Sequence, residues 1–156
     1  MRLPDGRLVE GYLRLDLLDY VVIVALADAG VIVLHSYKHG PADVVTSLPA
    51  GYLEPSEEPA EAARRELLEE TGHVAEDWEE LGTFIVDGNR GAGTVHMFLA
   101  RGARVIAAPG AGDLEETEMS FLPLDELVAA LQGGAIPVLP MAAAVALAAL
   151  RLSPRA

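Results

Sequence analysis

The segment from Pro59 to Gly72 constrains the fold and chemistry of this chain more than any other. It reads PAEAARRELLEETG, with a proline suited to the first turn of a helix and a glycine typical of the position just past a helix end. We therefore predict a helix that begins near Pro59 and stops at Gly72. Ala60, Ala63 and Leu67 share one stripe of this helix, which we expect to face the core.

Three glutamates concentrate negative charge on the adjoining stripe. Glu66, Glu69 and Glu70 stand at positions i, i+3 and i+4, so a helix places their carboxylates on one face. At about 4 Å and an effective dielectric constant near 20, each pair repels by roughly 4 kcal/mol before screening. A hard divalent cation such as Mg²⁺ or Mn²⁺, which takes oxygen ligands, would relieve that repulsion. The alternative is a solvated acidic face, which is common in a chain of net charge −13.

The residues before this helix favour the metal over the solvated face. From Gly51 onward the chain follows the pattern G-x5-E-x7-R-E-U-x-E-E-x-G-U, where U is a bulky aliphatic residue. Only the last position departs from the pattern, because His73 stands there, and we expect His73 to be a packing residue. The pattern is the Nudix box, so the chain resembles the Nudix hydrolases. This resemblance implies an α/β fold, the Nudix α/β/α sandwich with a mixed sheet.

Nudix enzymes cleave a nucleoside diphosphate linked to another moiety, by attack of water on a phosphorus atom. The resemblance implies that the box glutamates hold Mg²⁺ or Mn²⁺ ions, with the backbone carbonyl of Ala50 as a further ligand. Glu57 is implied to be either an outer metal ligand or a residue that orients the loop. The implied metal ligands are thus Glu66, Glu69, Glu70, Glu57 and Ala50.

Two further box positions carry expected roles. The resemblance implies that Arg65 pairs with a box glutamate and holds it in the metal-binding rotamer, so that Arg65 and Glu70 belong to the catalytic set. The alternative for Arg65 is an ordinary surface pair with Glu61 or Glu69. Gly51 lets the backbone approach a ligand closely, which makes it a candidate substrate-binding residue.

Matches outside the box extend the resemblance to the ADP-ribose (ADP-sugar) pyrophosphatase branch of the family. The best of them is the Leu-Pro-Ala-Gly that ends at Gly51, and others lie at residues 20–40 and 94–100. The branch usually has arginine where this chain has Lys38, which we expect to contact phosphate or ribose. Lysine is a point charge without the bidentate fork of arginine.

The water-activating base of that branch often lies in a later loop, which here is the acidic stretch 112–118. The resemblance favours Glu115 as the general base, followed by Glu118 and then Glu116. The alternative is an acidic loop with no catalytic role.

Few aromatic side chains are available to stack on a nucleobase. The candidates are Tyr12, Tyr20, Tyr37, Tyr52 and Trp78. The branch tends to form homodimers whose N-terminal strand reaches towards the partner's site, which favours Tyr12 and places residues 1–15 at the dimer interface. Arg90, in a glycine-rich loop, is expected to contact the ribose or a phosphate; ordinary solvation is the alternative.

Composition supports one globular domain over residues 1–156, with 51% hydrophobic residues. No uncharged apolar run reaches the roughly 18 residues of a membrane span. The N-terminus lacks the apolar region of a signal peptide and the chain has no cysteine, so we expect a cytoplasmic protein without disulfides. The net charge argues against a nucleic-acid polymer as partner, because no basic stripe is present.

Hydrophobic patterning predicts further elements on both sides of the acidic helix. Strands are expected at residues 7–13, 20–27, 31–37, 44–48, 81–86, 94–100 and 119–122, and helices from Pro123 to Gly133 and from Pro140 to Leu152.

The leading hypothesis is Mg²⁺-dependent hydrolysis of ADP-ribose or a related nucleoside diphosphate sugar, giving a nucleoside monophosphate and a sugar phosphate. One alternative is another Nudix substrate, such as a dinucleoside polyphosphate, NADH or a damaged nucleoside triphosphate. Another is a catalytically silent domain that senses a nucleotide. The intact glutamate set argues against a sensor.

Overall fold

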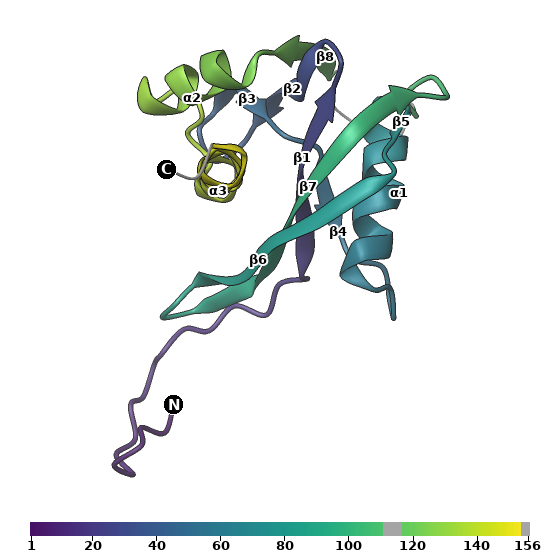
Figure 1. Cartoon of the computed structure of the whole chain (residues 1–156). Coiled ribbons are helices and arrows are strands. Elements are labelled where there is room, and N and C mark those ends of the chain that lie inside the picture. The colour runs from purple at the N-terminus through teal and green to yellow at the C-terminus, as the bar shows by residue number, and fades with distance from the viewer. Residues whose placement is uncertain (111–116, 154–156) are drawn as a thin grey trace.

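A computed structural model describes residues 1–110 and 117–153 of the chain (Figure 1). The strands are β1 (Tyr20–Ala27), β2 (Gly30–Lys38), β3 (Asp43–Ser47), β4 (Ala50–Tyr52), β5 (His73–Val74), β6 (Asp77–Asp87), β7 (Gly91–Val105) and β8 (Glu118–Leu122). The helices are α1 (Pro59–Thr71), α2 (Leu124–Gln132) and α3 (Leu139–Leu152).

β1 is the central strand of a mixed sheet with the order β3-β2-β1-β7-β5. It runs parallel to β7 and antiparallel to β2 and β4, while β6 pairs with β7 and β8 pairs with β2. Residues Val21–Ala25 are fully buried, as expected for a strand covered on both faces. The predicted α/β class with a mixed sheet is confirmed.

Successive side chains of β1 point to opposite faces of the sheet and enter two separate cores. Val22 and Val24 pack in a cluster with residues of α2 and α3. Val21 and Ile23 pack instead with Ala63 and other residues of α1. Figure 1 shows α1 on one side of the sheet and α2 with α3 on the other, which is the expected three-layer sandwich.

Local signals determine the ends of α1. Pro59 occupies the first turn, and Gly72 closes the helix in the left-handed conformation, at φ 71°, with its N–H donating to the carbonyl of Leu68. Ala63 and Leu67 are fully buried, as predicted, whereas Ala60 is partly exposed. The predicted helix over 59–72 is confirmed.

The N-terminal segment differs from the prediction. No strand forms over residues 7–13; residues 1–19 instead form an arm that extends from the body beside the β6–β7 hairpin (Figure 1). The arm makes only two isolated bridges, Arg2 with Leu8 and Leu15 with Gly91. An alternating pattern is not sufficient for a strand when no neighbouring strand accepts its backbone hydrogen bonds.

Two short strands, β4 and β5, were not predicted, and β6 and β7 are longer than expected. The glycine-rich stretch after Asp87 forms the tight end of their hairpin, where Asp87 pairs with Gly91.

No helix in the described part of the chain is both long and apolar enough to cross a membrane.

Candidate active site

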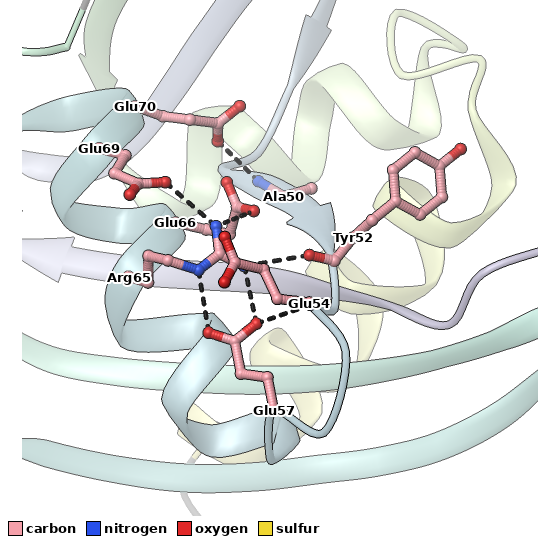
Figure 2. Close-up of polar contacts among 8 residues, drawn as sticks. All are labelled: Ala50, Tyr52, Glu54, Glu57, Arg65, Glu66, Glu69 and Glu70. Carbon is pink, nitrogen blue, oxygen red and sulfur yellow. Dashed lines mark hydrogen bonds and ion pairs between the residues drawn. The ribbon is translucent and has the colours of Figure 1, made fainter. Parts of the chain in front are cut away.

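A cleft of about 860 Å³ lies between β4 and the exposed face of α1 (Figure 2). Among the described strands, β4 pairs with β1 alone, so its other edge can meet side chains from the helix. The described residues that line the cleft are Lys38, Ala50, Gly51, Tyr52, Leu53, Glu54, Pro55, Arg65, Glu66, Glu69, Glu70 and Gly110. The cleft thus collects most of the box.

Arg65 organises the cleft, because all five of its N–H donors are used. Nε and Nη2 donate to the two carboxylate oxygens of Glu57, at 2.9 and 2.8 Å. Nη1 donates to Glu66 at 2.7 Å and to Glu69 at 3.0 Å. Nη2 also donates to the backbone carbonyl of Tyr52 at 3.0 Å. One guanidinium therefore ties three glutamates of the box to the free edge of β4.

Glu57 is the carboxylate most strongly held by this arginine. The bidentate pair with Arg65, followed by the N–H of Glu54 at 2.9 Å, lowers the pKa of Glu57 from 4.5 to about 2. The same pair raises the pKa of Arg65 above its ordinary value. Of the two implied roles of Glu57, these contacts favour the one that orients the loop.

Glu66 is also largely enclosed, with only 12% of its side chain exposed. A Cβ atom added at Gly51 would overlap the carboxylate of Glu66, so the glycine leaves the space that this side chain occupies. Burial raises the pKa of Glu66, and the hydrogen bond and charge of Arg65 oppose that shift.

Glu69 and Glu70 end the acidic face of α1. Glu70 accepts a hydrogen bond of 2.8 Å from the backbone N–H of Ala50, on the free edge of β4. The Glu69 side chain is 58% exposed and meets Arg65. Figure 2 shows the four box glutamates on the same side of the β4 edge, around Arg65.

The donor set fits a hard divalent cation, because all of its side-chain ligands are carboxylate oxygens. In the described residues, however, no three His, Asp or Glu side chains converge closely enough to hold a metal ion. Glu66 and Glu69 face Arg65, and Glu70 faces the Ala50 N–H. To take a shared ion, these side chains would have to turn away from those partners.

The substrate-binding residues expected from the sequence fall into two places. Lys38 and Gly51 line the cleft. Tyr12 and Arg90 lie together at the tip of the β6–β7 hairpin, where the Tyr12 hydroxyl donates to the Asn89 carbonyl at 2.6 Å and Arg90 pairs with Asp87 at 3.4 Å. Neither is among the described residues that line the cleft.

Of the three base candidates, Glu115 and Glu116 lie outside the described residues. Glu118 is exposed in β8 opposite His35 and is not among the described residues that line the cleft. Gly110 does line it, with its N–H donating to the carbonyl of Glu69 at 2.7 Å.

The sequence did not predict that the Glu54 N–H bonds Glu57 or that the Tyr52 carbonyl accepts from Arg65. Neither residue is a fixed position of the box. Both contacts depend on the path of the chain after β4, which the residue types do not reveal. His73 packs as predicted: it is buried, with Nδ1 2.7 Å from the Thr71 carbonyl oxygen and its ring edge-on to Phe121.

Comparisons with known proteins agree with the fold and the box. The NUDIX domain model matches residues 17–142. The chain is 32% identical over 108 residues to the methanol dehydrogenase activator of Bacillus methanolicus, covering 68% of this chain and 58% of that protein. It is 34% identical over 87 residues to the ADP-ribose pyrophosphatase of Bacillus subtilis (strain 168), covering 55% and 47%.

The chain thus spans about half the length of the curated relatives that it matches. A solved structure of an ADP compounds hydrolase superposes with a TM-score of 0.77 at 22% identity, covering 86% of this chain and 72% of that one. At this identity the likeness supports the fold alone.

Proposed function

The chain belongs to the NUDIX domain family, and from this we propose that it is a divalent-metal-dependent pyrophosphohydrolase acting on ADP-ribose or a related nucleoside diphosphate sugar. The products are a nucleoside monophosphate and a sugar phosphate. The similarity to an ADP-ribose pyrophosphatase supports the substrate class. The acidic cleft supports the chemistry.

The observation that carries this proposal is the arrangement around Arg65. A surface arginine would make one or two exchangeable pairs, whereas this one uses four of its five donors to hold Glu57, Glu66 and Glu69 and the fifth to bond the Tyr52 carbonyl of β4. Arg65 thus gathers these carboxylates at the cleft before a cation arrives, and a bound cation would then replace Arg65 as the partner of Glu66 and Glu69.

Glu66, Glu69 and Glu70 are the proposed ligands of Mg²⁺ or Mn²⁺, with the Ala50 carbonyl as a further ligand. A bound metal would neutralise the diphosphate and lower the pKa of a bound water. Lys38 supplies a positive charge at the same cleft, where it can pair with a phosphate. Arg65 and Glu57 position the ligands, and Glu115 is the proposed base that takes the proton of the attacking water.

We further propose a homodimer in which Tyr12 and Arg90 serve the site of the partner subunit. Their place at the hairpin tip, outside the described lining of the cleft, is the observation behind this assignment. Several apolar side chains of the same arm are exposed, among them Leu13, Leu17 and Leu18. Covering these side chains would favour association.

The test is a pyrophosphatase screen over ADP-ribose, ADP-glucose, GDP-mannose, NADH, Ap4A and a nucleoside triphosphate, with and without Mg²⁺. ADP-ribose should give a kcat/KM at least about tenfold above any triphosphate, which is roughly 1.4 kcal/mol of discrimination. A preference for triphosphates or Ap4A would favour another Nudix substrate. Nucleotide binding without turnover of any compound would favour a sensor.

A further inference from the structure

A second, smaller recess of about 180 Å³ adjoins the acidic cleft and has a different character. Its described lining is Tyr20, Ala50, Gly51, Tyr52 and Met141, without a charged side chain. Ala50, Gly51 and Tyr52 line both hollows, so the two meet at β4. Figure 2 shows the Tyr52 ring pointing away from the glutamates.

The alternation of side chains along β4 separates the two hollows. Position 51 faces α1, because a Cβ there would meet Glu66. Tyr52 therefore faces the opposite side of the sheet, towards Met141 of α3. Tyr20 is its partner across the β1–β4 ladder, and the two rings meet at 6.1 Å between centroids with 70° between their planes.

The edge-to-face contact leaves much of the Tyr52 ring uncovered. Tyr52 is 59% exposed, although it is bordered by Tyr20 and the thioether of Met141. A free aromatic face in an uncharged recess suits a flat, uncharged ring system. A ring bound there would lie on the opposite face of β4 from the carboxylates of the cleft.

A hydrogen bond also connects the recess to the acidic cleft. The carbonyl of Tyr52 accepts the hydrogen bond from Arg65, the same arginine that holds the glutamates. The backbone that carries the tyrosine ring is therefore fixed by the group that organises the cleft.

We propose that this recess binds the nucleobase of the substrate whose diphosphate lies in the acidic cleft, with the base stacked on Tyr52 and bordered by Tyr20 and Met141. The substrate then crosses the β4 edge, with its diphosphate on the Glu66 side and its base on the Tyr52 side. This inference rests on the proposed function. It assigns base recognition within one chain to Tyr52, whereas the sequence favoured Tyr12.

The test measures binding of the two product halves separately, by calorimetry in the presence of Mg²⁺. AMP carries a base, and ribose 5-phosphate does not. Tyr52→Ala should weaken AMP binding at least about fivefold, which is the lower range for loss of one base–aromatic stack. Binding of ribose 5-phosphate should stay unchanged, and Tyr52→Phe should bind AMP like wild type.

The matched control is Tyr37→Ala, which removes another exposed tyrosine, at the end of β2 and outside this recess. It should leave AMP binding unchanged. Circular dichroism and the Tm of each variant confirm that the fold is retained. The proposal is overturned if wild type does not bind AMP, if Tyr52→Ala binds AMP like wild type, or if Tyr52→Ala weakens both products equally.

The outcomes also separate this inference from the proposed function. Turnover of ADP-ribose by wild type with no effect of Tyr52→Ala on AMP binding would reject the recess and keep the function. Tyr52-dependent binding of AMP without turnover of any diphosphate sugar would reject the function and keep the recess.

Discussion

The carboxylate of Glu66 occupies the space that a side chain at Gly51 would fill. Gly51 does not have a backbone conformation reserved for glycine, so the requirement at this position comes from the close approach of Glu66. The first glycine of the box and the first glutamate of its helical cluster are therefore parts of one steric arrangement.

Gly51→Ala should fold but lose activity. The added methyl group displaces the flexible end of Glu66 and not the backbone, so the free energy of unfolding should change little. Metal affinity and kcat/KM should fall by about 10- to 100-fold, as when support of a metal ligand is lost. The control is Gly40→Ala, since nothing lies within 4 Å of a Cβ at Gly40. Full activity of Gly51→Ala would show that Glu66 need not occupy this place.

Arg65→Lys should impair the site although it keeps the charge. Lysine has three donors from one nitrogen and cannot pair with Glu57 through two parallel bonds while also reaching Glu66, Glu69 and Tyr52. We expect a loss of about 10- to 100-fold in kcat/KM. Arg64→Lys is the matched control, because Arg64 bonds the Ala60 carbonyl and stacks on the Trp78 ring outside the cleft. Equal losses in both variants would contradict the special role of Arg65.

Acid should weaken the fold partly through Glu57. Its pKa is about 2 in the folded chain against an ordinary 4.5, so the unfolded chain binds this proton at higher pH than the folded chain does. Its stabilising contribution is present above about pH 4.5 and is lost as pH falls towards about 2. Urea unfolding at stepped pH should show a shallower decline for Glu57→Gln than for wild type. Identical slopes would contradict the low pKa.

Glu66→Gln should change the pH dependence of the free energy of unfolding in the opposite direction, in the same urea series. Burial raises its folded pKa, so its contribution is present below the unfolded pKa and is lost as pH rises through the folded value. In EDTA, Glu66→Gln should therefore make the fall in stability on acidification steeper than in wild type, the reverse of Glu57→Gln.

Glu70→Gln should remove nearly all turnover without unfolding the chain. The glutamine oxygen can still accept the Ala50 N–H, while the negative charge offered to a metal is lost. We expect kcat/KM to fall by about 100-fold or more, and we expect wild type to show no detectable turnover in excess EDTA. Turnover that persists in EDTA would reject metal dependence.

Glu115→Gln and Glu118→Gln should differ in their effect on kcat. A general base contributes typically about 10²- to 10⁴-fold, so Glu115→Gln should reduce kcat by that factor with metal affinity unchanged. Glu118 is exposed in β8 and is not among the described residues of the cleft, so its variant should stay near wild type. The reverse result would move the base to Glu118.

The helix of the site was predictable because its signals are local. Pro59, Gly72 and the spacing of the glutamates act within a few residues of one another, and the structure confirms the helix they define. β4 was not predictable in this way. The stretch Pro49-Ala50-Gly51, which leads into β4, has the composition of a turn. Residues Ala50–Tyr52 nevertheless form a strand that pairs with β1 and is contacted by Arg65 and Glu70.

In the N-terminal arm, by contrast, a strand was predicted and none forms. Residues 7–13 alternate like a strand, but the described chain offers them no neighbouring strand. Likewise, Tyr12 and Tyr52 were both aromatic candidates, and the sequence favoured Tyr12 only through the family resemblance. The tertiary structure instead places Tyr52 beside the cleft and Tyr12 at the hairpin tip.

The guanidinium of Arg65 has a consequence for the order in which the protein matures. Because the Arg65 cation pairs with Glu57, Glu66 and Glu69 and offsets part of their combined negative charge, we expect the chain to complete its fold without a bound ion. This differs from small zinc domains, which remain unfolded until metal arrives. If the cleft takes the proposed metal, loading would exchange charge partners in an already folded molecule, and we expect protein made during metal scarcity to become active when the metal is supplied.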